Sequence, residues 1–103
     1  MQHTVIAILK AKLGKENQLR ESLLKIGELT RQEDGCIGFQ LYHDPENSSQ
    51  FGLYGQWNSK EQYQKQFKKP YVVEFLEKGE SLVEKPYQGF SGNDLPHKHV
   101  GAL

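Results

Sequence analysis

The sequence predicts an α+β fold whose elements follow one another in the order β-α-β-β-α-β. Apolar and polar residues alternate over 36–43 and again over 50–57, which is the period of half-buried strands. Over 15–32 apolar residues recur every three or four positions, as they do along one face of a helix. An antiparallel sheet with its helices on one face, the ferredoxin-like sandwich, has this order of elements.

The two alternating strands are expected to form a hairpin at the centre of the fold. The segment between them, DPENSS at 44–49, is dense in turn-forming residues. Trp57 ends the second strand, and Ser59 with Gln62 three residues later forms a capping-box pattern that begins the next helix. The only tryptophan is therefore expected where a strand gives way to a helix, a place where functional side chains are common.

The flanking elements follow from apolar runs, glycine and proline. A first strand over 3–12 is apolar without a break at 5–9, so we expect it in the middle of the sheet and buried on both faces. After the second helix, Pro70 is expected to open a short third helix over 70–78 that stops at Gly79. A last strand is expected over 81–90, with Pro86 at an edge or bulge, and 91–103 as a poorly ordered tail beyond a domain of 1–90.

Composition narrows the possible partners and the setting. A chain of 103 residues with a net charge of zero makes one domain and has no basic footprint for nucleic acid or an anionic membrane. It has no apolar run long enough to cross a bilayer and no pattern of a signal peptide, and its single Cys36 favours a reducing, cytoplasmic setting. Tyr42, Tyr54 and Tyr87 are expected on the uncovered sheet face. Because of these aromatic residues, and because only 36% of the residues are hydrophobic, we expect a homodimer.

The histidines and the cysteine offer weak candidates for chemistry. His43 shares a strand face with Phe39 and Leu41 and is a candidate base, although a position beside the turn favours a solvated side chain. His3 lies near the chain start and is uninformative. His97 and His99 supply two of the ligands that an ordered metal site needs, so no metal is predicted. Cys36 lies two residues after the acidic Asp34, which opposes a lowered thiol pKa, and is interpreted as packing.

Three segments resemble the antibiotic biosynthesis monooxygenase (ABM) family of small dimeric α+β barrel proteins. They read EDGCIGFQLYHDPEN, FGLYGQWNSKEQYQ and KKPYVVEF, and the resemblance covers about residues 4–90. The positions that match the family pattern are Glu33, Gly35, Cys36, Phe39, Leu41, Asp44, Pro45, Phe51, Tyr54 and Trp57. The resemblance implies that two ferredoxin-like chains join into a dimeric barrel.

The chain departs from the family pattern at several positions that are often polar there. Gly55 stands where a glutamate is frequent, and Leu53 stands where an asparagine occurs in members that oxidise polyphenols. Gln66 replaces a frequent histidine of the second helix. A frequent Ser-Pro-His segment reads Lys69-Pro70-Tyr71 here.

The resemblance implies oxidation of a small quinol or phenol without metal, flavin or other cofactor. Such a substrate is activated by its own deprotonation, so the protein supplies an apolar pocket and a few polar groups. Trp57 and Tyr63 are then the expected catalytic residues, the tryptophan as a wall or stacking surface and the tyrosine as a hydrogen-bonding group. The expected substrate-binding residues are Leu53, Phe67, His43 and Tyr71. Trp57, Tyr63 and Tyr71 also fit a plain role as core aromatics.

Other functions remain open at this stage. Haem degradation, known in related barrels, requires an axial histidine after Pro70 and an asparagine in the first strand. This chain has Leu76 near the former position and no asparagine in that strand, which disfavours it. Isomerisation or ring processing of a small signalling molecule also suits the fold. A non-catalytic domain that binds a small molecule or assembles is the alternative from a different class.

Overall fold

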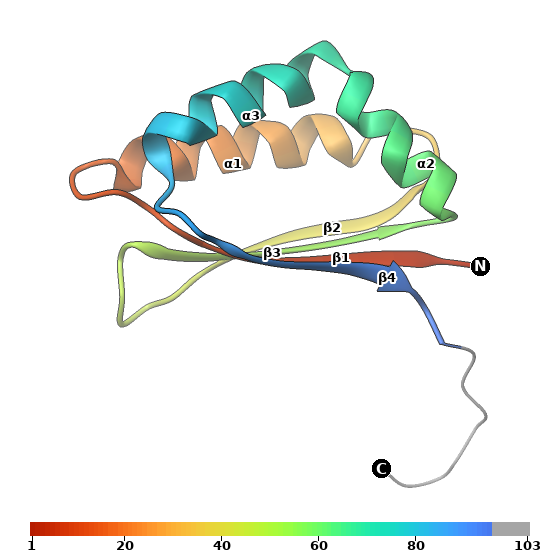
Figure 1. Cartoon of the computed structure of the whole chain (residues 1–103), viewed down its shortest axis with the longest axis horizontal. Coiled ribbons are helices and arrows are strands. Elements are labelled where there is room, and N and C mark those ends of the chain that lie inside the picture. The colour runs from red at the N-terminus through yellow and green to blue at the C-terminus, as the bar shows by residue number, and fades with distance from the viewer. Residues whose placement is uncertain (96–103) are drawn as a thin grey trace, which may run out of the picture.

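Four strands form one antiparallel sheet in the order β2-β3-β1-β4, and three helices cover one of its faces (Figure 1). The computed structural model describes residues 1–95. Its elements are β1 (His3–Lys10), α1 (Glu16–Thr30), β2 (Cys36–His43), β3 (Gln50–Trp57), α2 (Lys60–Lys65), a 3-10 turn η1 (Gln66–Lys68), α3 (Pro70–Leu82) and β4 (Gln88–Asn93). The α+β class, the ferredoxin-like order and the hairpin are confirmed.

The two faces of the sheet differ in burial. On β1, Leu9 points toward the helices and is buried, whereas Ile6 and Ile8 point the other way and are 49% and 42% exposed. The strand is central, between β3 and β4, as expected. The expectation that both of its faces are buried is wrong for the single chain, because all the helices lie on one side (Figure 1).

The helix layer sits close to the sheet where a small residue allows it. Leu19 and Leu23 of α1 are fully buried in the core. Gly27 in the same helix faces Leu41 of β2, and a Cβ atom at this glycine would lie 3.0 Å from the leucine Cδ1 atom. The glycine therefore lets α1 approach β2 more closely than a larger residue would permit.

The expected start of α2 is confirmed in its geometry. Ser59 is extended, and its side chain accepts a hydrogen bond from the Gln62 backbone N–H at 3.2 Å. Just before it, the Asn58 N–H donates to the carbonyl of Gly35, which ties the end of β3 to the start of β2. The junction after Trp57 is therefore fixed on both sides, and α2 lies over the end of the sheet where β1 begins (Figure 1).

The expected end of α3 and position of the last strand are wrong. The helix runs through Gly79 to Leu82, because Leu82 and Val83 complete the core and Val83 bridges to Ala11. The strand begins only after Pro86, at Gln88. It runs to Asn93, past residue 90, where the tail was expected to begin. His97 and His99 lie outside the described residues.

Candidate functional site

A cavity of about 780 Å³ lies between the helix layer and the sheet. Its floor is formed by β1, β3 and β4 together with Phe39 of β2, and its roof by α1, α2, η1 and α3. The main contacts between helices and sheet are those of α1 with β2 and of α2 with β3. The space over β1 and β4 is thus left for the cavity, whose size lies in the range of small-molecule sites.

The mouth of the cavity is apolar and accessible. Phe67, Leu76 and Tyr87 line it and are 45%, 46% and 55% exposed. They come from η1, α3 and the segment before β4, so the opening lies between the end of the helix layer and the β4 edge. Tyr87 therefore belongs to the cavity and not to the uncovered sheet face.

Aromatic rings close the cavity at the end under α2. Trp57 is 3% exposed, and its ring centroid lies 6.5 Å from that of Tyr63. Tyr63 in turn lies 5.2 Å from Phe67, edge to face. All three line the cavity, so the structure brings both expected catalytic residues together with one expected binding residue. Burial is the main cause that raises the pKa of Tyr63, and a hydrogen bond with Ser91 opposes the shift.

The positions that depart from the family pattern on β3 also face this cavity. Leu53 and Gly55 lie on the same strand face as Trp57 and line the floor. A Cβ atom at Gly55 would lie 3.4 Å from the Phe39 ring and 3.6 Å from the Trp57 Nε1 atom. A Cβ atom there would thus be in ordinary van der Waals contact with both rings, and with Leu53 and Gly55 this part of the floor has no polar side chain.

A chain of hydrogen bonds reaches the cavity wall from outside. Lys69 Nζ donates to Glu33 Oε1 at 3.2 Å, and the Tyr71 hydroxyl donates to Glu33 Oε2 at 2.7 Å. The same hydroxyl oxygen lies 3.1 Å from Gln66 Oε1. Gln66 is buried and lines the cavity, whereas Tyr71 does not line it and borders a small surface groove. Tyr71 was expected to bind substrate directly, and its hydroxyl is instead engaged by Glu33.

This chain has defined protonation states. The hydrogen bond from Tyr71 is the largest cause that lowers the pKa of Glu33, and Lys69 adds to it. Burial, and then the neighbouring Glu33 carboxylate, raise the pKa of Tyr71 to about 12. Near neutral pH the carboxyl group is therefore ionised and the phenol keeps its proton.

His3 lies unexpectedly in the wall behind the aromatic cluster. It is 3% exposed, and its ring centroid lies 5.1 Å from that of Tyr63. The Nδ1 atom is 2.8 Å from Asn93 Oδ1 on β4, whereas Nε2 has no hydrogen-bond partner among residues 1–95. Strand alternation was the signal that could have found it, since His3 shares its face with Leu9.

His43 and Cys36, the other ionisable candidates, do not line the cavity. His43 is exposed, stacks on Phe51 and is 2.9 Å from the carbonyl of Ser48, so it belongs to the hairpin and does not line the cavity. Burial is the main cause that raises the pKa of the Cys36 thiol, which agrees with its interpretation as packing. Glu80 and Lys85 form an ion pair at the opposite end of the cavity from Trp57.

Residues 1–95 contain neither a cluster of metal-ligating side chains nor a long apolar helix. No group of three or more histidine, cysteine, aspartate or glutamate side chains there is placed to hold a metal ion. In the same residues, no helix has the length and apolar character that spanning a membrane requires.

Comparison with known proteins agrees with the geometry. Residues 2–78 match the family described as antibiotic biosynthesis monooxygenase. The chain belongs to this family. Proteins of the ABM family are commonly dimeric and bind small molecules.

The individual similar proteins support the fold, and their names give no substrate. An uncharacterized protein of Synechocystis sp., sll1783, is 34% identical over 59 residues, which make up 57% of this chain and 40% of that protein. Rv0793 from Mycobacterium tuberculosis superposes with a TM-score of 0.85 at 21% identity, covering 94% of this chain and 98% of its own. PA3566 from Pseudomonas aeruginosa superposes with a TM-score of 0.83 at 22% sequence identity, and the match covers 92% of this chain and 95% of PA3566.

Proposed function

We propose that this ABM protein is a cofactor-independent monooxygenase that oxidises a small phenolic or quinol compound in its cavity. The observation that carries the proposal is the apolar cavity closed by Trp57 and Tyr63, with few polar groups in its walls. A flat aromatic ring fits beside the tryptophan, because offset or edge-to-face contacts between rings are favourable. We further propose that the protein works in the cytoplasm, where its single cysteine stays reduced.

The cavity supports this chemistry through desolvation and hydrogen bonding. A deprotonated phenol is electron-rich enough to react with O₂ directly, and an apolar site protects the intermediate from water. The overall change is RH₂ + O₂ → RO + H₂O, in which the substrate supplies both electrons that reduce the second oxygen atom to water. The Tyr63 hydroxyl, beside Ser91, is the group that we assign to hold the substrate oxygen.

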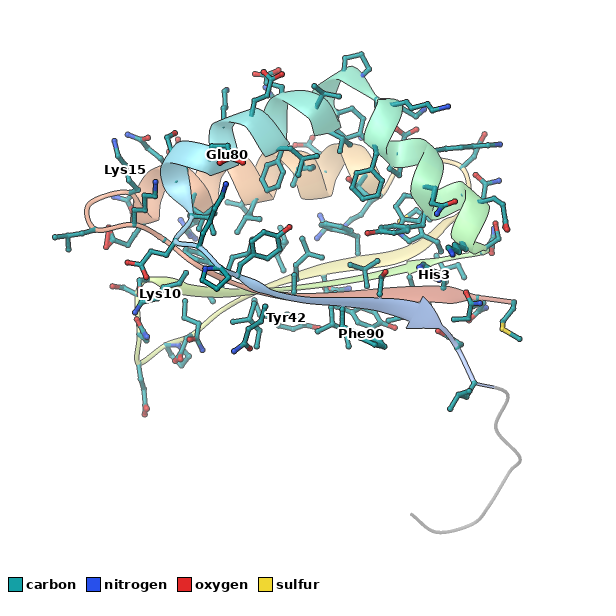
Figure 2. All side chains as sticks on the ribbon, in the orientation of Figure 1. His3, Lys10, Lys15, Tyr42, Glu80 and Phe90 are labelled. Atoms are coloured by element: carbon teal, nitrogen blue, oxygen red, sulfur yellow. The ribbon has the colours of Figure 1, made fainter. Side chains whose placement is uncertain are left out.

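Self-association is part of the proposal. The sheet face away from the helices carries Ile6, Ile8, Tyr42 and Phe90, all of which are exposed in the single chain. Figure 2 shows Tyr42 and Phe90 on that side of the sheet. A second copy that packs on this face would bury it and leave the cavity, on the opposite face, free to bind ligand.

The test is oxygen uptake with a panel of quinols and phenols and with no cofactor added. We expect uptake by the wild type, a loss of about a hundredfold in rate for Tyr63→Phe and a smaller loss for Trp57→Phe. Gln64→Ala, an exposed change on the same helix as Tyr63, is the control and should behave as wild type. Uptake that is unaffected by both cavity variants would refute the assignment of the site.

A second function is favoured by Leu53 and Gly55. They leave the floor beside Trp57 without the polar groups frequent in the family, which suits a domain that binds a small aromatic molecule without converting it. Tight binding of the same compounds without any oxygen uptake would support this alternative.

A further inference from the structure

The orientation of one polar group in the cavity wall is determined by its neighbours. Gln66 is 7% exposed and lines the cavity. Its amide oxygen, Oε1, lies 3.1 Å from the hydroxyl oxygen of Tyr71. That hydroxyl oxygen is also 2.7 Å from Glu33 Oε2. A hydroxyl group has a single proton, so Tyr71 donates one full hydrogen bond and not two.

Glu33 is the group that receives this proton. Its other oxygen is 3.2 Å from Lys69 Nζ, so the carboxylate is ionised and acts only as an acceptor. Hydrogen bonds to charged acceptors are shorter and stronger than those to neutral ones, in line with 2.7 Å against 3.1 Å. The phenol keeps its proton throughout the neutral range, because its pKa is about 12.

The Tyr71 oxygen therefore offers Gln66 only lone pairs, which an amide oxygen cannot use. A half-turn about the last bond of Gln66 exchanges its oxygen and nitrogen without changing the shape of the side chain, and the hydrogen-bond partners decide between the two orientations. In the turned orientation Nε2 donates to Tyr71 and Oε1 faces the cavity.

We infer that Gln66 is a specificity-determining residue that presents its amide oxygen to the ligand, so the site selects compounds that offer a hydroxyl proton at this point. Tyr71, Glu33 and Lys69 act as positioning residues, because they fix the amide without touching the ligand. The inference rests on the proposed function and narrows its substrate class to hydroxyl-bearing aromatic compounds.

The selection follows from the cost of burying unpaired acceptors. A phenolic hydroxyl donates to the Gln66 oxygen, whereas a carbonyl or an ether oxygen would face it as a second acceptor and leave both without a proton.

The test measures binding alone. Isothermal titration calorimetry under anaerobic conditions compares 1-naphthol with 1-methoxynaphthalene, which share a ring system and differ in the hydroxyl proton. We expect the wild type to bind 1-naphthol about tenfold more tightly, the loss that an unmade hydrogen bond in a buried site causes. Gln66→Met and Tyr71→Phe should bring the two affinities toward parity, the first by removing the acceptor and the second by freeing the amide to turn.

The control is Gln64→Met, the same substitution at an exposed position of α2, which should keep the wild-type preference. If circular dichroism shows that Gln66→Met does not fold, the comparison of the two affinities in Tyr71→Phe decides whether the inference holds. Equal binding of the two compounds by the wild type, or an unchanged preference in the folded variants, would overturn this inference and leave the proposed function intact. Failure of the wild type to bind either compound would overturn both.

Discussion

The substitution Tyr42→Ser should dissociate the proposed dimer. Tyr42 lies on β2, on the sheet face away from the helices, and is 58% exposed in the single chain (Figure 2). A tyrosine has about 200 Å² of surface, so about 115 Å² of it is available for burial against a partner. At about 25 cal/mol per Å² this surface contributes up to about 3 kcal/mol per copy.

Symmetry doubles the effect, because one substitution changes both copies. Full coverage of the ring would then contribute about 6 kcal/mol to the dimer and half coverage about 3 kcal/mol. We therefore expect the dissociation constant to rise at least about a hundredfold.

Sedimentation equilibrium over a concentration series measures this constant. Leu13→Ser is the matched control, since Leu13 is 95% exposed in the β1–α1 turn and lies off the sheet. It should associate as the wild type does. A Tyr42→Ser protein that associates as tightly as the wild type, or a wild type that is monomeric at micromolar concentration, would refute the reasoning.

Four further substitutions test what stabilises the fold. Ser59→Ala removes the cap of α2 and should cost about 1 kcal/mol in urea unfolding. Gly35 has φ of 85° and its Cβ would lie 2.8 Å from the Gln62 side chain, so Gly35→Ala should lower the free energy of unfolding. Gly79→Ala, in α3 where a Cβ atom would meet nothing within 4 Å, should raise the free energy of unfolding by about 0.5–1 kcal/mol. Because the folded pKa of Tyr71 is raised to about 12, the unfolded chain loses this proton first; wild type should lose stability between pH 10 and 12, and Tyr71→Phe should lack that loss in alkaline melts.

Local rules were enough to predict the hairpin and the start of α2. Alternation in β3, turn formers at 44–49 and the Ser59 cap each act within a few residues, and all three predictions agree with the structure. The end of α3 failed because long-range packing overrides a local stop signal. Gly79 is a plausible helix end by itself, but burial of Leu82 against the core keeps the chain helical for three more residues.

Which residues face the cavity was predictable where a residue's face follows from its own strand or helix, whereas the roles expected of them came from the family resemblance. Trp57 and Leu53 were placed by alternation, and Tyr63 with Phe67 by helical spacing. Gln66 was noted only as a departure from the family pattern and not as a site residue, since its place in the wall depends on a hydrogen bond to Tyr71 and through it on Glu33, 33 residues earlier in the sequence. A network that joins three separate elements has no short-range pattern in the sequence.

The alternation that identified the strands also separates the two proposed roles of the sheet. Leu53 and Trp57 face the cavity, while Tyr54 between them faces the opposite side with Ile6, its partner on β1. In this proposal, neighbouring positions on one strand serve different processes, ligand binding on one face and dimerisation on the other. A variant at Trp57 should change ligand binding at constant dimer affinity, and a variant at Tyr42 should do the reverse, because the backbone of the sheet lies between the two surfaces. Equal loss of both properties in either variant would mean that the cavity depends on the partner copy.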